Sequence, residues 1–158
     1  MIPTRIISGG QTGADRGGLD AALVLGIAHG GWVPRGRRAE DGPVPLQYEV
    51  REMASPEYDD RTRRNVVEAD GTVIFTVGPP TGGSKLTYEH AMTTAKPVLS
   101  IELGPRCVVP PGAVERFRRW LEGHQIRTLN VAGSRESGTP GMQRAVRDFL
   151  IQALRADT

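Results

Sequence analysis

Short β-type apolar runs alternate along the chain with longer stretches in which apolar residues recur at helical spacing. The last stretch shows this best, because Met142, Val146, Phe149 and Leu150 fall on one face of a helix. The short runs predict strands at Thr4–Ser8, Ala28–Val33, Tyr48–Glu52, Thr72–Val77, Pro97–Ile101 and Arg127–Val131. The periodic stretches predict helices at about Asp15–Leu25, Tyr58–Ala69, Lys85–Ala95, Gly112–Gly123 and Pro140–Leu154.

The connections between these elements are short, except that proline and glycine interrupt both patterns between Pro34 and Gln47, where we expect a long loop. Strands that alternate with helices through short connections are typical of a parallel sheet covered by helices. The pattern therefore predicts an α/β fold with a mainly parallel sheet and helices on both faces. We expect one domain over residues 1–158, which is within the usual length of a single domain.

Three glycine- and hydroxyl-rich loops each follow a predicted strand and precede a predicted helix: Gly9–Gly18, Thr81–Thr87 and Ala132–Gly138. Glycine lets backbone N–H groups approach a ligand, and a helix N-terminus carries partial positive charge. In a parallel sheet such loops open at one edge, so three of them predict one crevice for an anionic ligand. A tight turn without a ligand is the alternative explanation for any single loop.

The first loop matches neither of the two common phosphate-binding patterns. Gly13 and Gly18 have the spacing of a P-loop, but Leu19 stands where the lysine is needed. Gly9, Gly10 and Gly13 also depart from the dinucleotide fingerprint, and the acidic residue expected after the second strand is missing. The sequence therefore disfavours P-loop nucleotidases and ordinary NAD binding.

Charged side chains near the loops leave alternatives open. Asp15 is expected to cap the first helix and orient the loop. Arg61 and Asn65 share one face of a helix and could reach the crevice together, although Arg61 could instead belong to a solvated face. Arg35 or Arg37 could close over the crevice as a lid, or lie on a surface loop.

Composition excludes several classes of protein. The net charge of +2 does not indicate a nucleic-acid partner, and no apolar run approaches the roughly 20 residues of a membrane span. Cys107 is the only cysteine and the three histidines lie far apart, so we expect neither a disulfide nor a metal site. The first strand begins almost at the N-terminus, without a signal-peptide pattern, and we expect a cytoplasmic protein.

Five motifs together resemble the molybdenum cofactor carrier family, and the similarity runs from Arg5 to about Leu150. These motifs are Ser8–Gly17, Gly31–Gly42, Tyr58–Val66, Thr81–Thr87 and Asn130–Ser137. The resemblance implies a Rossmann-like fold that binds the molybdenum cofactor, a pterin with a dithiolene-held metal and a terminal phosphate. It also implies a homo-oligomer that protects the cofactor and delivers it to a molybdoenzyme recipient. For such a carrier we expect no catalytic residues.

A wider superfamily contains nucleotide phosphoribohydrolases, once called lysine decarboxylases, whose hallmark is Pro-Gly-Gly-x-Gly-Thr-x-x-Glu. This chain has the two glycines and the glutamate, but Lys85 and Leu86 replace the Gly-Thr of the hallmark. The alternative function is therefore a nucleotide-binding sensor, or an enzyme in which Glu89 and Arg61 assist glycosidic cleavage.

Under the leading hypothesis, backbone donors of the first two loops hold the phosphate. Arg16, Arg61 and Lys85 balance its charge, while Gln11, Asn65 and Thr87 read the heterocycle or its oxo groups. No soft side-chain ligand for the metal is expected, because the cofactor brings its own dithiolene. The predicted ligand-binding residues are Gly9, Gly10, Gln11, Thr12, Gly13, Arg16, Arg61, Asn65, Thr81, Gly82, Gly83, Ser84, Lys85, Thr87, Gly133, Ser134 and Arg135.

Overall fold

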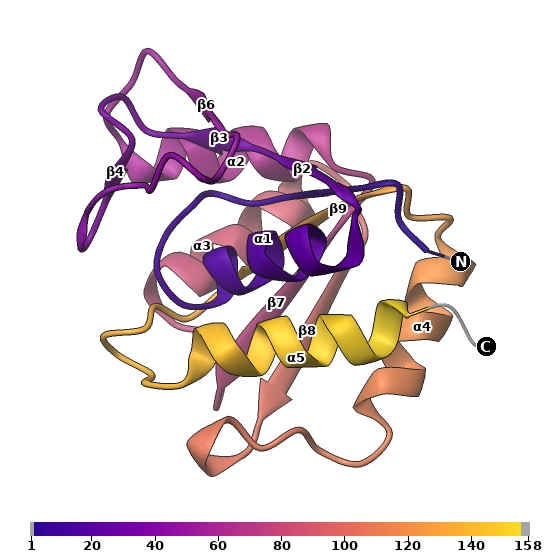
Figure 1. Cartoon of the computed structure of the whole chain (residues 1–158). Helices are drawn as coiled ribbons and strands as arrows, with labels where there is room; N and C mark the ends of the chain where they lie inside the picture. Colours follow the sequence, from indigo (N-terminus) through magenta and orange to yellow (C-terminus); the bar gives the residue numbers. More distant parts are fainter. Residues whose placement is uncertain (1, 156–158) are drawn as a thin grey trace.

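A sheet of five parallel strands forms the centre of the computed structural model, which describes residues 2–155 (Figure 1). Its strands are β1 (Arg5–Ile7), β2 (Ala28–Gly30), β7 (Gly71–Val77), β8 (Val98–Leu103) and β9 (Thr128–Gly133), in the spatial order β2-β1-β9-β7-β8. The helices are α1 (Ala14–Leu25), α2 (Tyr58–Glu68), α3 (Gly82–Thr93), α4 (Ala113–Gly123) and α5 (Met142–Leu154), with a 3-10 turn at Pro105–Cys107.

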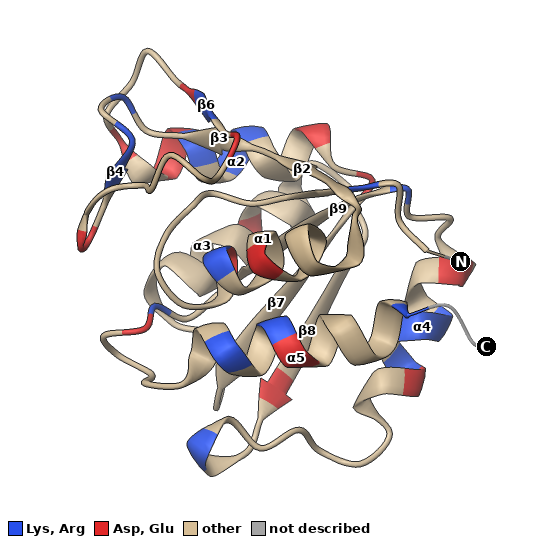
Figure 2. Cartoon of the chain, viewed as in Figure 1, with Lys and Arg blue, Asp and Glu red and all other residues tan. Residues whose placement is uncertain are grey.

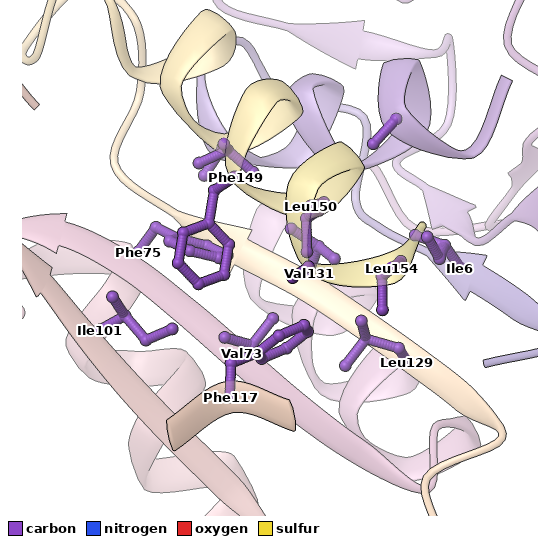
Figure 3. Packing of buried hydrophobic residues seen from close by; sticks show 14 of the residues in the cluster. Ile6, Val73, Phe75, Ile101, Phe117, Leu129, Val131, Phe149, Leu150 and Leu154 are labelled. Atoms are coloured by element: carbon purple, nitrogen blue, oxygen red, sulfur yellow. The ribbon is translucent and has the colours of Figure 1, made fainter. Parts of the chain in front are cut away.

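Helices cover both faces of this sheet, which confirms the predicted α/β class. On one face, side chains of α1, α4 and α5 pack on alternate residues of the strands in the main hydrophobic core (Figure 3). There Phe149 of α5 meets the rings of Phe75 and Phe117 edge-on at centroid distances of 5.2 and 5.5 Å. Helices α2 and α3 pack against the other face (Figure 1).

The face toward α2 and α3 is more polar. Because side chains alternate along a strand, Val73 and Phe75 of β7 enter the main core while Thr72 and Thr76 point the other way. Buried Asn130 of β9 donates through Nδ2 to the Thr72 hydroxyl at 3.2 Å. This hydrogen bond gives both buried side chains a partner, so this side of the sheet can be polar although it is buried.

The predicted strand Ala28–Val33 is wrong in one respect, because the structure divides it at Gly31. Gly31 has a φ of 122°, and a Cβ there would lie 2.1 Å from the carbonyl oxygen of Ser8. The chain therefore leaves the central sheet after β2. The next residues form β3 (Trp32–Val33), which pairs in parallel with β6 (Arg51–Glu52) in a separate two-stranded sheet.

The loop predicted between Pro34 and Gln47 also contains a short antiparallel pair, β4 (Arg38–Ala39) and β5 (Gly42–Pro43). Of the predicted strand Tyr48–Glu52, only Arg51 and Glu52 are in β structure. We call residues 34–50 the strap. A small core of Leu19, Val33, Ala39, Val44 and Tyr48 holds it against α1.

Two helix starts differ from the prediction. Helix α1 begins at Ala14, with Gly13 at the N-cap, so the expected capping role of Asp15 is wrong. Gly13 takes this place because its φ of 82° suits glycine. Helix α3 begins at Gly82 rather than Lys85, after Thr81 in extended conformation.

Within residues 2–155, no helix has the length and apolar character needed to cross a membrane.

Candidate functional site

The three glycine loops meet, as the sequence predicts, around a cavity of about 370 Å³ at the edge where β1, β7 and β9 end. Helix α2 forms a further wall. The lining residues are Gly9, Gln11, Asp15, Tyr58, Asp59, Arg61, Thr62, Asn65, Thr81, Gly83, Ser84, Leu86, Thr87, Asn130, Ala132, Gly133, Ser134, Arg135, Ser137, Gly138 and Thr139.

The topology explains why the cavity forms here. From β1 the chain continues through α1 to β2 at one side of the sheet, whereas from β7 it continues through α3 to β8 at the other side. The loops therefore diverge above the centre of the sheet, where β1 and β7 flank β9. Such a switch of direction leaves a crevice at the carboxyl ends of parallel strands, which is the usual ligand position in this class of fold.

Arg61 is the main cation of the cavity. Its side chain is only 8% exposed, and its Nε is buried without a hydrogen-bond partner within the described residues. Nη1 donates to the neighbouring Thr62 hydroxyl at 2.6 Å. Burial lowers the pKa of Arg61, and the carboxylate of Asp15 acts against that effect. A buried guanidinium with an unused donor is costly, and an anionic ligand would satisfy it.

Gly9 allows Arg61 to take this position. A Cβ on Gly9 would lie 2.6 Å from Nε of Arg61 and 2.8 Å from its guanidinium carbon. Any larger residue would thus push the guanidinium away from the first loop. The sequence predicts that Gly9 brings its backbone close to a ligand. In the structure Gly9 instead lets the first loop lie close to Arg61, which lines the same cavity.

Gln11 supplies a second unused donor. Its Oε1 accepts the backbone N–H groups of Thr12 and Glu40 at 3.1 and 2.9 Å, which fixes the orientation of the amide. Its Nε2 is buried without a partner among the described residues, and Gln11 is only 5% exposed. Two nine-tenths-buried side chains therefore line one cavity with donors that the protein leaves unused.

Asp15 lies in the first turn of α1 and orients the first loop, as expected, by accepting the N–H of Gln11 at 3.1 Å. Burial raises the pKa of this carboxyl, while Arg61, the Gln11 N–H and Arg16 lower it. Asp59 also lines the cavity, and one of its oxygens lies 2.6 Å from Nε2 of His90 on α3. The cavity wall thus combines acceptors with its cations.

Three guanidinium groups gather around the ring of Tyr58, a site feature that sequence reasoning missed. The guanidinium carbons of Arg38, Arg135 and Arg61 lie 4.5, 5.0 and 5.3 Å from the ring centroid. Arg38 belongs to β4, and Figure 2 shows basic positions of β4 and α2 at the same corner of the molecule. Of these three arginines, only Arg135 forms an ion pair within residues 2–155, with Glu40 at 3.9 Å.

Two residues predicted to read a heterocycle already have partners. The amide of Asn65 accepts the N–H of Trp32 at 2.8 Å and donates to the Trp32 carbonyl at 3.0 Å, so it ties α2 to β3. The hydroxyl of Thr87 donates to the carbonyl of Gly83 at 2.9 Å. Both residues line the cavity, but their polar atoms hold the walls in place.

Other predicted residues lie outside the cavity lining for identifiable reasons. Arg16 forms a bidentate pair with Asp41 at 2.5 and 2.7 Å and donates to the Gly10 carbonyl at 3.0 Å. A Cβ on Gly13 would lie 2.2 Å from the Ser134 carbonyl oxygen, because the first and third loops pack directly together. Gly10 similarly packs under Val33.

Thr12, Gly82 and Lys85 are also absent from the lining. The Thr12 hydroxyl donates to the carboxylate of Glu40 and accepts the N–H of Glu136 at 3.2 Å. Gly82 and Lys85 are exposed in the first turn of α3. The remaining predicted residues do line the cavity: Gly9, Gln11, Arg61, Asn65, Thr81, Gly83, Ser84, Thr87, Gly133, Ser134 and Arg135.

The strap does not place Arg35 or Arg37 in the cavity. Arg37 donates to the carbonyl oxygens of Val44, Pro45 and Tyr48 at 2.8 to 2.9 Å, so it holds the strap together. Arg35 is exposed. The arginine of this segment that approaches the site is Arg38, one residue beyond the predicted pair, through its contact with Tyr58. The spacing of arginines in the sequence could not distinguish among them.

Comparisons with known proteins agree with this architecture. The model of the circularly permutated YpsA SLOG family matches residues 6–154. Among solved structures, one is described as a putative molybdenum carrier protein from Syntrophus aciditrophicus SB, and it is 41% identical with a TM-score of 0.88. That similarity covers 98% of this chain and 96% of the other. A comparison with curated proteins found no match.

Proposed function

We propose that this chain, which belongs to the circularly permutated YpsA SLOG family, is a non-catalytic carrier for the molybdenum cofactor. The family and the relative described as a molybdenum carrier both support a ligand-binding role. In our proposal the ligand is a phosphorylated pterin that lies in the cavity between the three loops and α2. We further propose that the carrier acts as a homo-oligomer in the cytoplasm and passes its ligand to a molybdoenzyme.

The observation that carries this proposal is the buried guanidinium of Arg61, whose Nε has no hydrogen-bond partner among the described residues. Together with Nε2 of Gln11, this group offers buried donors that have no partner within the described residues. Hydrogen bonds from charged groups to phosphate oxygens are among the strong ones in proteins. The phosphate of the ligand therefore belongs beside Arg61, Gln11 and the backbone of Gly9.

The rest of the cavity suits a flat polar heterocycle. Its volume of about 370 Å³ falls within the roughly 300 to 1,000 Å³ of small-molecule sites. A pterin edge carries N–H donors beside an oxo acceptor. The carboxylates of Asp15 and Asp59 line the cavity and are suitable acceptors for such donors. The metal stays on the dithiolene of the cofactor, so the proposal requires no side-chain ligand.

The nucleotide hydrolase alternative receives less support from the geometry. Glu89, its catalytic candidate, is exposed on α3 and does not line the cavity. We therefore propose binding without turnover.

The proposal predicts that Arg61 controls cofactor retention. Protein incubated anaerobically with isolated molybdenum cofactor is passed over a sizing column, and protein-bound molybdenum is measured. Arg61→Gln should lower the affinity by about tenfold to a hundredfold, because a charged hydrogen bond to phosphate is lost. Arg63→Gln is the matched control, since Arg63 is exposed on the same helix outside this cavity.

Two results would contradict the proposal. Wild-type protein that retains no molybdenum at micromolar concentration is not a carrier of this cofactor. Equal retention by Arg61→Gln and wild type would place the ligand elsewhere on the protein.

A further inference from the structure

The carboxylate of Glu40, in the strap, lies in a set of donors that resembles an anion site. Its Oε2 accepts the Ser137 hydroxyl at 2.7 Å, and its Oε1 accepts the Thr12 hydroxyl and the Ser137 N–H, the latter at 3.3 Å. Nη1 of Arg135 lies 3.9 Å from Oε2. Two hydroxyls, a backbone N–H and a guanidinium thus converge on one carboxylate.

These donors come from the loops that form the cavity. Ser137 and Arg135 both line it, and Thr12 is in the first glycine loop. Arg135 also shares the Tyr58 ring with Arg61. Burial lowers the pKa of Arg61, and the nearby charge of Arg135 lowers it further. The donors around Glu40 therefore continue the positive side of the cavity.

The strap has a second, separate anchor beside this one. The neighbouring Asp41 forms the bidentate pair with Arg16, which does not line the cavity. The Glu40 backbone N–H also binds Oε1 of Gln11, whose free Nε2 is one of the unused donors. The two adjacent acidic residues thus have different roles. Glu40 pairs with Arg135, which lines the cavity, whereas Asp41 pairs with Arg16, which does not.

We propose that Glu40 is an internal competitor for the cavity, whose carboxylate holds the donors of Ser137 and Arg135 until an anionic group of the ligand displaces it. The inference rests on the proposed function only in requiring that the cavity binds an anion. Binding then releases the Glu40 contact, and the strap loosens around residues 38–43 while Asp41 still ties it to Arg16.

Inorganic pyrophosphate is a suitable probe, because it carries one anionic group for Arg61 and a second for Ser137 and Arg135. Titration calorimetry at low salt compares wild type, Glu40→Gln and Asp41→Asn. Glutamine keeps a hydrogen-bonding side chain but removes the charge. We expect Glu40→Gln to bind pyrophosphate about twofold to fivefold more tightly than wild type, the range typical of one partly exposed charge pair. Asp41→Asn should bind like wild type, although it weakens the same segment.

Hydrogen exchange on the wild-type protein gives an independent measurement. Saturating pyrophosphate should speed amide exchange in residues 38–43, because the displaced carboxylate no longer holds them. The inference is overturned by slower or unchanged exchange, by equal affinities of wild type and Glu40→Gln, or by an equal gain in Asp41→Asn. It is also overturned if Glu40→Gln binds no pyrophosphate. Failure of the cofactor to bind would refute only the carrier function, since these measurements use pyrophosphate alone.

Discussion

At the scale of single residues, the site is marked by polar groups that the protein leaves without partners. Arg61 and Gln11 are each more than nine-tenths buried and keep a donor unused. Other buried side chains of the same cavity, such as Asn65 and Asn130, have hydrogen bonds within the chain. Proteins satisfy nearly all buried polar groups, so two exceptions in one cavity are a reason to expect a ligand there, whereas the third such atom among the described residues, Oγ of Ser100, lies outside the cavity lining. A sequence shows which residues are polar, but not which of them lack a partner.

Gly9 provides a test at this scale. Gly9→Ala would place a methyl group 2.6 Å from Nε of Arg61. Because the guanidinium is the flexible end of a long side chain, it should move rather than unfold the protein. We expect about a tenfold loss of pyrophosphate affinity with little change in melting temperature. Calorimetry and thermal unfolding measure the two effects.

Gly123→Ala is the control for the added methyl group. Gly123 ends α4, outside the cavity lining, and nothing lies within 4 Å of a Cβ there. Its affinity should equal that of wild type. If Gly9→Ala also binds like wild type, the contact between Gly9 and Arg61 has no role in binding.

At the scale of elements, the strap is the part that the pattern of the sequence described least well. The strands and helices around it follow from apolar periodicity, and their order gave the correct fold class. The break at Gly31 depends instead on the carbonyl of Ser8, the residue after β1, and β4 and β5 are only two residues each. Contacts between segments far apart in the chain, such as Glu40 with Ser137, leave no local signal in the sequence.

Tyr48 tests how firmly the strap is held to α1. It is buried, and its hydroxyl donates to Asp20 of α1 at 2.6 Å. Burial first, and then the hydrogen bond and charge of Asp20, raise the pKa of Tyr48 to about 12. Since an unfolded tyrosine ionises near pH 10, this group stabilises the fold below pH 10, and that contribution disappears as the pH rises toward 12.

A Tyr48→Phe variant separates this effect from others. Below pH 10 it should unfold at lower denaturant concentration, with a loss of about 1 kcal/mol for one hydrogen bond. Wild type should lose that advantage between pH 10 and 12. Ultraviolet titration should show a tyrosine ionising near pH 12 that is missing in the variant. A stability difference that persists unchanged to pH 12 would argue against the hydrogen bond.

At the scale of the whole molecule, one cavity collects segments from across the chain. That the three glycine loops meet could be predicted, because parallel strands end at one edge. Which loop residues face the cavity could not, since the first and third loops pack on each other through Gly13 and Ser134. The basic cluster around Tyr58 likewise joins β4, α2 and the third loop, and only the folded chain brings these together.

The central claim is that the buried donors of Arg61 and Gln11 hold the anionic end of the ligand. The most direct test is a crystal structure of the protein soaked anaerobically with molybdenum cofactor, with the metal located by its anomalous scattering. We predict a phosphate within hydrogen-bond distance of Arg61 Nε and Gln11 Nε2, and the metal elsewhere in the same cavity. A cofactor bound outside this cavity, or inside it with its phosphate away from Arg61, would contradict the account.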